Sequence, residues 1–301
     1  MTNIDENIKA SLRIANANRM VALPDGSIMP QMGQGTWYLG EDPAKRQEEI
    51  EALRLGVELG MTLIDTAEMY GDGKSERLVG EAIKGIRDQV YLVSKVYPHR
   101  ASRNEILAAC AESLRRLDTD HLDLYLLHWR GNVPLSQTIA GMEQLKAEGK
   151  IGRWGVSNFD IHDMQDLLSM EHGNQCQVNQ VLYHLGSRGI EFDLLKWQRE
   201  HNIPTMAYSP LAQGGRLREQ LLESEEVQSI AKKHGVEALQ IILAWCLIHP
   251  DVVAIPRSSN PDHTYLNAQA ATIRLDDEDL KRLDARFPAP TFKTALDTIQ
   301  G

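Results

Sequence analysis

Residues 90–129 read VYLVSKVYPHRASRNEILAACAESLRRLDTDHLDLYLLHW. Short apolar runs at 90–96 and 122–128, rich in β-branched and large apolar residues, predict two buried strands. Between them, residues 102–117 carry a helical pattern. Two strands joined through a helix pair in parallel, because the helix returns the chain to the edge where the first strand began. The segment therefore predicts a parallel sheet covered by helices.

The same alternation continues in both directions from this segment. Further strands are predicted at 33–37, 62–67, 152–158, 176–184, 204–210 and 252–258. Further helices are predicted at 46–60, 76–86, 136–149, 192–201 and 262–271. A chain of 301 residues could hold two domains, but eight strands alternating with helices are arranged most simply as one closed barrel. We predict an α/β fold, a (β/α)₈ TIM barrel, as a single domain over residues 20–301.

Three segments lie outside the repeating units. Pro24-Asp25-Gly26 is a turn signal between two short apolar runs, which predicts a hairpin before the first strand, placed to cap the bottom of the barrel. An extra C-terminal helix is predicted at 276–286, and the tail after it could be a flap over the active face or a disordered end. Residues 1–19 form a polar N-terminal extension, which we expect to be disordered.

Composition limits the classes of function. The formal net charge of −10 disfavours nucleic acid, because phosphate contacts need a basic patch. No apolar run is long enough to span a membrane, and the polar N-terminus is not a secretory signal. The three cysteines are far apart and match no metal or redox spacing, which fits reduced thiols in the cytoplasm. We expect a cytoplasmic protein that binds neither nucleic acid nor membrane and, without internal repeats or an evident apolar patch, acts as a monomer.

Polar side chains end three neighbouring predicted strands. Asp65 ends the second strand, Lys95 lies near the end of the third, His128 ends the fourth, and Tyr70 follows Asp65 in its loop. Taken singly, His128 is readily explained as a hydrogen-bonded core histidine, Tyr70 as a loop aromatic and Asp65 as a turn cap. A buried lysine, however, needs a partner, and Asp65 is the nearest carboxylate. Because active sites of such barrels lie at the carboxyl ends of the strands, we expect the four side chains to form one site.

These four side chains make chemical sense together. An isolated tyrosine, with a pKa of about 10, transfers protons poorly at neutral pH. An adjacent ammonium stabilises the phenolate, so we expect Lys95 to lower the pKa of Tyr70. Asp65 would then hold Lys95 in place, and His128 would hydrogen-bond the oxygen whose charge changes. A tyrosine acid beside a lysine suits protonation of a carbonyl oxygen while hydride arrives at the carbon.

At these residues the sequence resembles the aldo-keto reductase family. The segment DTAEMYGDGKSERLVG (65–80) is similar to the family signature, and six further segments match family motifs in the family's order: LVSKV, LYLLHW, WGVSNF, VNQVLYH, AYSPLAQGG and IPRSSNPDHTYLNAQA. The resemblance covers roughly residues 20–287 and is strongest to the bacterial methylglyoxal-reductase branch. It implies NAD(P)H-dependent reduction of aldehydes and reactive ketones, with Tyr70 as general acid and Lys95, Asp65 and His128 supporting it.

A nicotinamide cofactor is therefore expected, yet the dinucleotide fingerprint fails, because Tyr38 stands where Gly33-x-Gly35 would need its third glycine. Barrels instead bind phosphate near strands seven and eight. The resemblance assigns Ser157, Asn158 and Gln180 to the nicotinamide carboxamide and Tyr208 to the face of the ring. It assigns the loop after strand seven to the pyrophosphate. The residues expected in that loop and beside it, at the end of strand one, are Ser209, Leu211, Gln213, Gly214, Gly35 and Thr36.

The segment IPRSSNPDH is expected to hold the adenosine end of the cofactor. Arg257 stands where the family usually has lysine and still provides a cation for a 2′-phosphate, with Ser258 beside it at the start of a helix. Asn267 matches the adenine contact. His263 stands where many NADPH-specific members have arginine, and a neutral histidine grips phosphate less well. We therefore expect NADPH as the cofactor, with NADH possible.

Trp37, Trp129 and Tyr97 are expected to wall the site of a small carbonyl substrate, because they follow strands on the active face. Two other functions are considered. A cofactor-binding regulatory subunit with slow or vestigial reductase activity is disfavoured by the intact group of four. A metal-dependent barrel hydrolase using Asp65, His128 and His184 would leave Lys95 unexplained, and we predict no metal.

Overall fold

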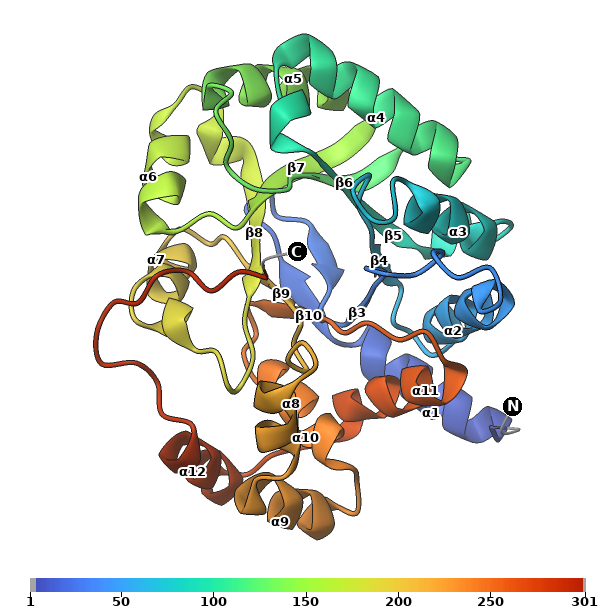
Figure 1. The fold of residues 1–301 in the computed structure, drawn as a ribbon, viewed down its shortest axis with the longest axis vertical. Coiled ribbons are helices and arrows are strands. Elements are labelled where there is room, and N and C mark those ends of the chain that lie inside the picture. The colour runs from blue at the N-terminus through green and yellow to red at the C-terminus, as the bar shows by residue number, and fades with distance from the viewer. Residues whose placement is uncertain (1–3, 300–301) are drawn as a thin grey trace.

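Eight parallel strands form the centre of the computed structural model, which describes residues 4–299 (Figure 1). They pair in chain order, each with its neighbours in sequence. The strands are β3 Gly33–Gly35, β4 Leu63–Asp65, β5 Tyr91–Val96, β6 Leu122–Leu127, β7 Ile151–Ser157, β8 Cys176–Leu182, β9 Thr205–Tyr208 and β10 Val252–Ile255. The predicted (β/α)₈ barrel is confirmed, with each predicted strand found within a few residues of its expected position.

The first and last strands meet and close the barrel. Parallel bridges join Met32 to Ala254 and Gly35 to Arg257, and the Gly35 amide donates to the Pro256 carbonyl over 3.0 Å. A Cβ atom on Gly35 would lie only 2.9 Å from the Ile255 carbonyl oxygen, so this position requires glycine. Gly35 is therefore required where the first and last strands of the barrel meet. This requirement explains why a glycine stands here although the sequence has no dinucleotide fingerprint.

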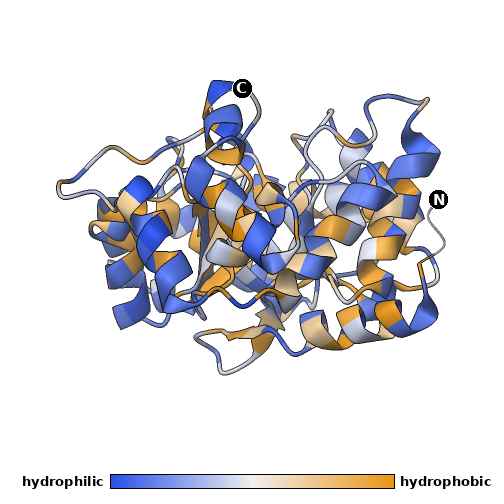
Figure 2. Ribbon diagram, turned by 90° about the horizontal axis from the view of Figure 1, so that it is seen from below, coloured by the Kyte–Doolittle hydropathy of each residue, from blue (hydrophilic) through white to orange (hydrophobic). Residues whose placement is uncertain are grey.

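Helices surround the barrel and turn their hydrophobic sides toward it, while their outer sides are hydrophilic (Figure 2). The α-helices are α1 Glu6–Ala17, α2 Arg46–Glu58, α3 Lys74–Ile83, α4 Arg103–Leu117, α5 Leu135–Ala147, α6 Ile161–Ser169, α7 Leu194–Glu200, α8 Arg216–Leu222, α9 Glu225–His234, α10 Ala238–Cys246, α11 Pro261–Gln269 and α12 Asp277–Arg286. Short 3₁₀ helices are η1 Arg87–Gln89, η2 Pro98–Arg100, η3 Gly173–Gln175, η4 Gly189–Glu191 and η5 Ala270–Thr272. Within residues 4–299, none of the helices has the length and apolarity that a membrane span requires.

Apolar side chains pack in two layers. The larger cluster lies between strands and helices, and a smaller one fills the interior of the barrel, including Leu63, Leu124 and Met206. Val21 and Met29 of the hairpin belong to the interior cluster. The barrel is therefore a packed core rather than a channel, and its only place for a ligand is at a rim.

The predicted hairpin is confirmed and caps the bottom of the barrel. It consists of β1 Met20–Ala22 and β2 Ile28–Pro30, which pair antiparallel. Its turn residue Asp25 accepts from Arg153 near the start of β7, and its amide donates to Gln177 at the start of β8. The amino-terminal ends of the strands are therefore covered, and the carboxyl-terminal rim is left for function.

The expectation of a disordered N-terminal extension is wrong for most of its described residues, because α1 is a packed helix. Asp5 caps its start by accepting from the Asn7 amide. Asn16 is buried and donates to the Leu59 and Ala268 carbonyls, which ties α1 to the ends of α2 and α11. Arg13 adds a hydrogen bond to the Glu58 carbonyl. The polar sequence concealed this role because α1 is held mainly by hydrogen bonds to carbonyls rather than by a wide apolar face.

The C-terminal tail crosses the active face, so of the two expectations for it the flap is correct for residues 288–299. The predicted extra helix is present as α12, and residues 288–299 return from it past α7 to the mouth of the barrel, where Ile299 lines the cavity (Figure 1). Lys293 bonds the capping carboxylates of Asp160 and Asp193, at the starts of α6 and α7. Ser187 donates to Asp297, close to the rim. These contacts hold the tail across one side of the opening.

Candidate active site

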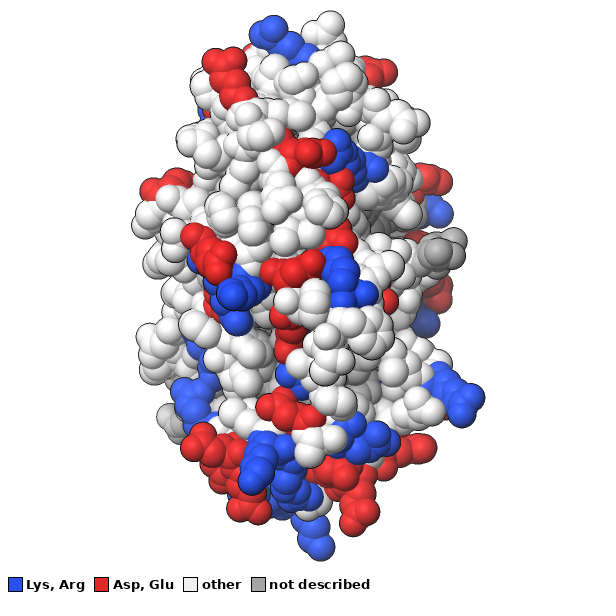
Figure 3. Space-filling model, turned by 90° about the vertical axis from the view of Figure 1, so that its left-hand side faces the viewer, with Lys and Arg blue, Asp and Glu red and all other residues white. Residues whose placement is uncertain are grey.

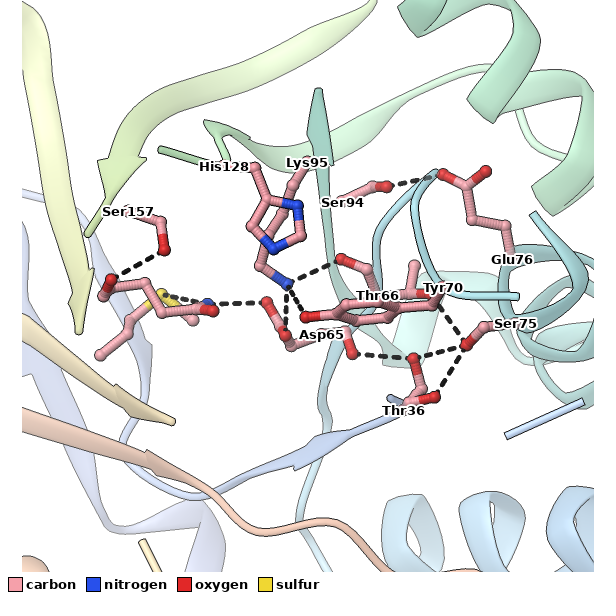
Figure 4. A network of polar contacts seen from close by, with 12 residues as sticks. Thr36, Asp65, Thr66, Tyr70, Ser75, Glu76, Ser94, Lys95, His128 and Ser157 are labelled. Atoms are coloured by element: carbon pink, nitrogen blue, oxygen red, sulfur yellow. Dashed lines mark hydrogen bonds and ion pairs between the residues drawn. The ribbon is translucent and has the colours of Figure 1, made fainter. Parts of the chain in front are cut away.

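Asp65, Tyr70 and Lys95 form one hydrogen-bonded group at the carboxyl-terminal rim (Figure 4). The Lys95 ammonium is fully buried and donates to Asp65 Oδ2 (2.6 Å), to the Thr66 carbonyl (2.9 Å) and to the Tyr70 hydroxyl (3.1 Å). Its three protons thus meet three acceptors. The predicted Asp65–Lys95 pair is present, and because the Tyr70 oxygen accepts from Lys95, the phenol proton is left for transfer.

His128 stands against Tyr70, with ring centres 5.7 Å apart and an edge-on arrangement. The ring lines the cavity, and its buried Nδ1 has no hydrogen-bond partner within residues 4–299. The backbone carbonyl of His128 accepts from Asn158 over 3.1 Å, which joins the ends of β6 and β7. The four side chains predicted from the sequence are therefore brought together.

The charge states follow from burial and from the neighbouring charges. Burial raises the pKa of Tyr70, and the Lys95 ammonium offsets this only in part. Lys95 does lower the pKa of Tyr70, as expected, but burial outweighs it, so the expectation of a net fall in that pKa is wrong. Burial alone would lower the pKa of Lys95, but the contacts with Asp65 and Tyr70 outweigh burial and raise this pKa. Burial, followed by the charge of Lys95, holds the pKa of His128 well below its usual range. At neutral pH the site contains a protonated phenol, an ammonium and a neutral imidazole.

A chain of buried hydroxyl groups supports the loop that carries Tyr70. Thr66 donates to Ser75 over 3.2 Å, Ser75 to the Thr36 hydroxyl over 2.8 Å, and Thr36 to the Asp65 carbonyl over 3.0 Å. The Tyr70 carbonyl also accepts from the Ser75 amide. Since each hydroxyl is satisfied, the chain fixes the start of α3 against the ends of β3 and β4. The loop geometry thus rests on polar groups that the apolar core cannot supply.

Two buried carboxylates hold the same loop from outside. Glu68 accepts from the Tyr97 amide over 2.8 Å and pairs with Arg100, so the loop is tied to the end of β5. Glu76, in α3, accepts from Ser94 over 2.6 Å and pairs with Arg116. Burial raises the pKa of Glu68. Tyr70 is therefore held by hydrogen bonds on both sides of its loop.

The site opens into a cavity of about 390 Å³ at the carboxyl-terminal rim. Most of the residues predicted to bind substrate or cofactor line it. They are Gly35, Thr36, Trp37, Asp65, Tyr70, His128, Trp129, Ser157, Asn158, Gln180, Tyr208, Ser209, Leu211, Gln213, Gly214 and Arg257. Lys95 lies beneath them and reaches the cavity through Asp65 and Tyr70.

The amide and hydroxyl groups assigned to the nicotinamide end are linked to one another. Tyr208 donates to Asn158 Oδ1 over 2.8 Å, and Ser157 donates to the Gln180 carbonyl over 2.8 Å. Gln180 Nε2 donates to Asp65 Oδ1 over 2.8 Å, which occupies the second oxygen of that carboxylate. The amide nitrogen of Gln180 is thus committed to Asp65, and its amide oxygen is the part left for a ligand.

Backbone strain gathers at this rim. Tyr38, Asn158, Ser209 and Ala212 line the cavity with φ between 50° and 67°, the left-handed region that residues other than glycine seldom adopt. Such conformations persist where the surrounding structure enforces them, and they concentrate at functional sites. The strain supports a function for this rim.

At the adenosine end the structure separates the predicted residues. Arg257 lines the cavity, but Ser258, His263 and Asn267 do not. The Ser258 hydroxyl bonds the backbone of Asn260, which caps α11, His263 is exposed, and Asn267 is buried within α11. The residues at the start of α11 therefore lie outside the cavity lining.

The aromatic walls are partly as predicted. Trp37 and Trp129 line the cavity, and Trp37 stacks near Tyr70 with ring centres 6.2 Å apart. Tyr97 is absent from the lining, and its ring lies edge-on behind Trp129 at 6.0 Å. Tyr97 therefore does not line this cavity; the chain turns into η2 directly after it, and its ring contacts Trp129.

Eight residues of the cavity lining were not predicted from the sequence: Tyr38, Met69, Pro210, Ala212, Arg218, Ile255, Pro256 and Ile299. Met69 precedes Tyr70 and could have been included by adjacency. Arg218 and Ile299 come from α8 and the tail, and no periodicity or strand-end rule points to either of them.

The metal-dependent alternative is not supported by the geometry. Within residues 4–299, no three His, Cys, Asp or Glu side chains are grouped as metal ligands. His184 lies in the turn after β8, where its Nδ1 accepts from the Gly186 amide, while Asp65 is committed to Lys95.

Comparison with known proteins gives a consistent result. Residues 31–286 match the aldo/keto reductase family. The chain is 53% identical over 281 residues to methylglyoxal reductase YeaE of Escherichia coli (strain K12), covering 93% of this chain and 99% of that protein. It is 36% identical over 268 residues to glyoxal reductase of Bacillus subtilis (strain 168), covering 88% and 91%. A crystal structure of an aldo/keto reductase from Klebsiella pneumoniae in complex with NADP and acetate superposes with a TM-score of 0.91 at 51% identity, covering 93% and 99%.

Proposed function

The chain belongs to the aldo/keto reductase family and reduces aldehydes and reactive ketones with NAD(P)H, and we propose that its substrates are small 2-oxoaldehydes such as methylglyoxal. The observation that carries the proposal is the contact of Lys95 with both Asp65 and Tyr70 at the base of an aromatic-walled cavity. This group can protonate a carbonyl oxygen at neutral pH.

The lining fits a phosphorylated nicotinamide dinucleotide, which no experimental structure of this chain contains. Asp65 is compensated by Lys95, whereas Arg218 and Arg257 line the cavity without a carboxylate partner among the described residues. The uncompensated charge of the described lining is therefore positive, as an anionic cofactor requires. Ser157, Asn158 and Gln180 present short amide and hydroxyl groups that match a carboxamide.

We propose the following division of roles among the chain's residues. Tyr70 donates its proton to the carbonyl oxygen, and Lys95 stabilises the phenolate that remains. Asp65 keeps the ammonium in place and is itself held by Gln180. Neutral His128 hydrogen-bonds the carbonyl oxygen and orients the substrate. The cofactor, when bound, supplies the hydride equivalent to the carbonyl carbon.

The proposed substrate size follows from the walls of the cavity. Trp37, Trp129, Met69 and Ile299 line the part that a carbonyl compound would share with the cofactor. A cavity of about 390 Å³ must hold the nicotinamide end as well as the substrate, so little room is left for a bulky group. The similarity to proteins named methylglyoxal and glyoxal reductases supports a small, activated aldehyde.

A substrate series tests this proposal. The kcat/KM with NADPH would be measured for methylglyoxal, for phenylglyoxal, which keeps the two carbonyls but adds a ring, and for propanal, which keeps the size but has one carbonyl. We expect methylglyoxal to give the highest value, because it combines small size with an activated aldehyde. A clear preference for phenylglyoxal would reject the size argument, and a preference for propanal would reject the dicarbonyl assignment.

We propose that the protein works as a monomer in the cytoplasm and that residues 20–301 form one domain. Its three cysteines are buried and unpaired, as in a reducing compartment. Size-exclusion chromatography with light scattering would measure the oligomeric state.

A further inference from the structure

Glu68 is a buried carboxylate in the loop between Asp65 and Tyr70. Its side chain is only 3% exposed, whereas the face seen in Figure 3 presents acidic and basic side chains next to one another at the surface. A carboxylate is almost never buried to this extent unless it is paired and hydrogen-bonded. The burial of Glu68 therefore requires partners, and these partners indicate its role.

The partners of Glu68 come mainly from the segment that follows β5. Its Oε1 accepts from the Tyr97 amide over 2.8 Å, and its Oε2 accepts from Arg100 over 2.5 Å. Arg116 of α4 lies 3.9 Å from the same Oε2. Both oxygens of the carboxylate are thus used, and one of them binds the main chain two residues after Lys95.

The contact with Tyr97 continues a connection between β4 and β5 that the backbone alone does not complete. The two strands pair only as far as Asp65 and Val93. Beyond this point the Thr66 amide donates to the Val93 carbonyl over 2.9 Å, but the Glu68 amide lies 3.4 Å from the Lys95 carbonyl oxygen. A backbone hydrogen bond of that length is weak. The Glu68 side chain therefore supplies the short hydrogen bond that ties the loop to the end of β5.

This tie affects the distance between Tyr70 and Lys95. The Tyr70 hydroxyl lies 3.1 Å from the Lys95 ammonium, although the two residues come from different elements. Lys95 is paired within the sheet, whereas Tyr70 is carried by the loop, two residues after Glu68. If the loop moved away from β5, the ammonium would stabilise the phenolate less well. A displacement of about 1 Å at a reacting group can cost about a hundred-fold in rate.

We propose that Glu68 is a positioning residue for proton transfer, which holds the Tyr70 loop against the strand of Lys95 by accepting from the Tyr97 amide. This inference rests on the proposed function, because it takes Tyr70 as the proton donor. Asp65 then holds the ammonium, and Glu68 holds the loop that brings the phenol to it.

A double-mutant cycle tests whether Glu68 acts through Tyr70. The kcat and the KM for methylglyoxal would be measured at saturating NADPH for the wild type, Glu68→Leu, Tyr70→Phe and the double variant. Glu68→Leu should lower kcat by about ten- to a hundred-fold in the wild-type background. In the Tyr70→Phe background it should lower kcat by less than about two-fold, because the group that it positions is already absent. NADPH affinity, measured by tryptophan fluorescence, should not change, since Glu68 does not line the cavity.

Three further variants identify the contact responsible. Glu68→Asp keeps the charge beside Arg100, which favours folding, but draws the carboxylate back from the Tyr97 amide. It should lose at least about five-fold in kcat, with the same suppression in the Tyr70→Phe background. Glu68→Gln keeps an acceptor for the Tyr97 amide and should lose less than about three-fold. Glu112→Gln is the matched control, because Glu112 also pairs with Arg100, over 3.0 Å, but lies in α4, and this variant should behave like the wild type.

Several results would overturn the inference. A loss by the same factor in both backgrounds would mean that Glu68 acts on the fold or, through Tyr97 and Trp129, on the substrate. A wild-type kcat in Glu68→Leu would show that the tie is not needed, and an equal fall in Glu68→Gln would assign the effect to charge instead of the amide contact. Failure of the proposed function gives a different result, in which the wild type reduces no aldehyde or Tyr70→Phe alone keeps the wild-type kcat.

Discussion

Lys95 has three ammonium protons and three acceptors, and this match explains why a lysine can be fully buried in the barrel. A buried ammonium is costly unless it is paired and hydrogen-bonded. Asp65 provides the charge, and the side chain of Tyr70 brings its hydroxyl from Lys95 to the cavity, which Asp65 also lines. Lys95, whose burial apolar packing alone does not explain, therefore connects the barrel core to the proposed proton donor Tyr70.

At the scale of single residues, the sequence predicts which residues form the site better than it predicts where their side chains point. Asp65, Tyr70, Lys95 and His128 were located because polar residues at strand ends are informative. The sequence does not show whether an aromatic ring at the end of a strand lines the cavity. Tyr97 and Trp129 each follow a strand, but only Trp129 lines the cavity, because the chain turns into η2 directly after Tyr97. The net pKa direction of Tyr70 was also missed, since burial cannot be read from a loop sequence.

Arg257 gives a prediction about cofactor choice. We expect Arg257→Ala to weaken NADPH binding by about ten- to a hundred-fold and to change NADH binding little, because only NADPH carries a 2′-phosphate. Tryptophan fluorescence quenching, with Trp37 and Trp129 in the cavity, would measure both affinities. Arg257→Lys should recover much of the loss, and equal losses for the two cofactors would contradict the assignment.

At the scale of elements, the errors have a common physical origin. Helices α1 and α6 and the three helices α8, α9 and α10 between β9 and β10 were not predicted. Asn16 fixes α1 through hydrogen bonds to carbonyls 43 and 252 residues away, which no local pattern reveals. The strands and the remaining helices were predictable because their apolar spacing is local.

The turn after β8 connects the barrel to the C-terminal tail and gives a pH-dependent prediction. His184 is buried there and accepts from the Gly186 amide, and burial lowers its pKa to about 4, with Asp297 opposing weakly. In the unfolded chain a histidine has a pKa of about 6.5. Between these values the unfolded state binds more protons, so stability falls as the pH falls, by at most about 1.4 kcal/mol per pH unit for one such group.

His184→Gln isolates this effect, because glutamine keeps an acceptor but does not titrate. Urea unfolding at pH 7 and pH 5 would give the free energy of unfolding for both proteins. We expect the wild type to lose about 1–2 kcal/mol more than the variant between the two pH values. Identical losses would show that His184 does not remain neutral in the folded state. The other buried histidines cause acid destabilisation in both proteins and cancel in the comparison.

At the scale of the whole molecule, the two ends of the barrel have different tasks. The hairpin and α1 pack against the amino-terminal end, and the strained loops, the cavity and the tail lie at the carboxyl-terminal rim. The eight strands and six of the helices that follow them could be predicted from the sequence, because their apolar spacing is local. The course of the tail could not, because Lys293 and Asp297 are fixed by partners that lie far away along the chain.

Tyr70→Phe is the most direct test of the account, because it removes one hydroxyl and leaves the ring in the cavity. NADPH oxidation with methylglyoxal would be followed by absorbance at saturating cofactor, and NADPH affinity by tryptophan fluorescence. We predict a fall in kcat of at least about a hundred-fold, as expected for loss of a general acid, with NADPH affinity nearly unchanged. A variant that kept the wild-type kcat would show that Tyr70 is not the proton donor, and the assignment of Lys95, Asp65 and His128 as its supporting residues would fail with it.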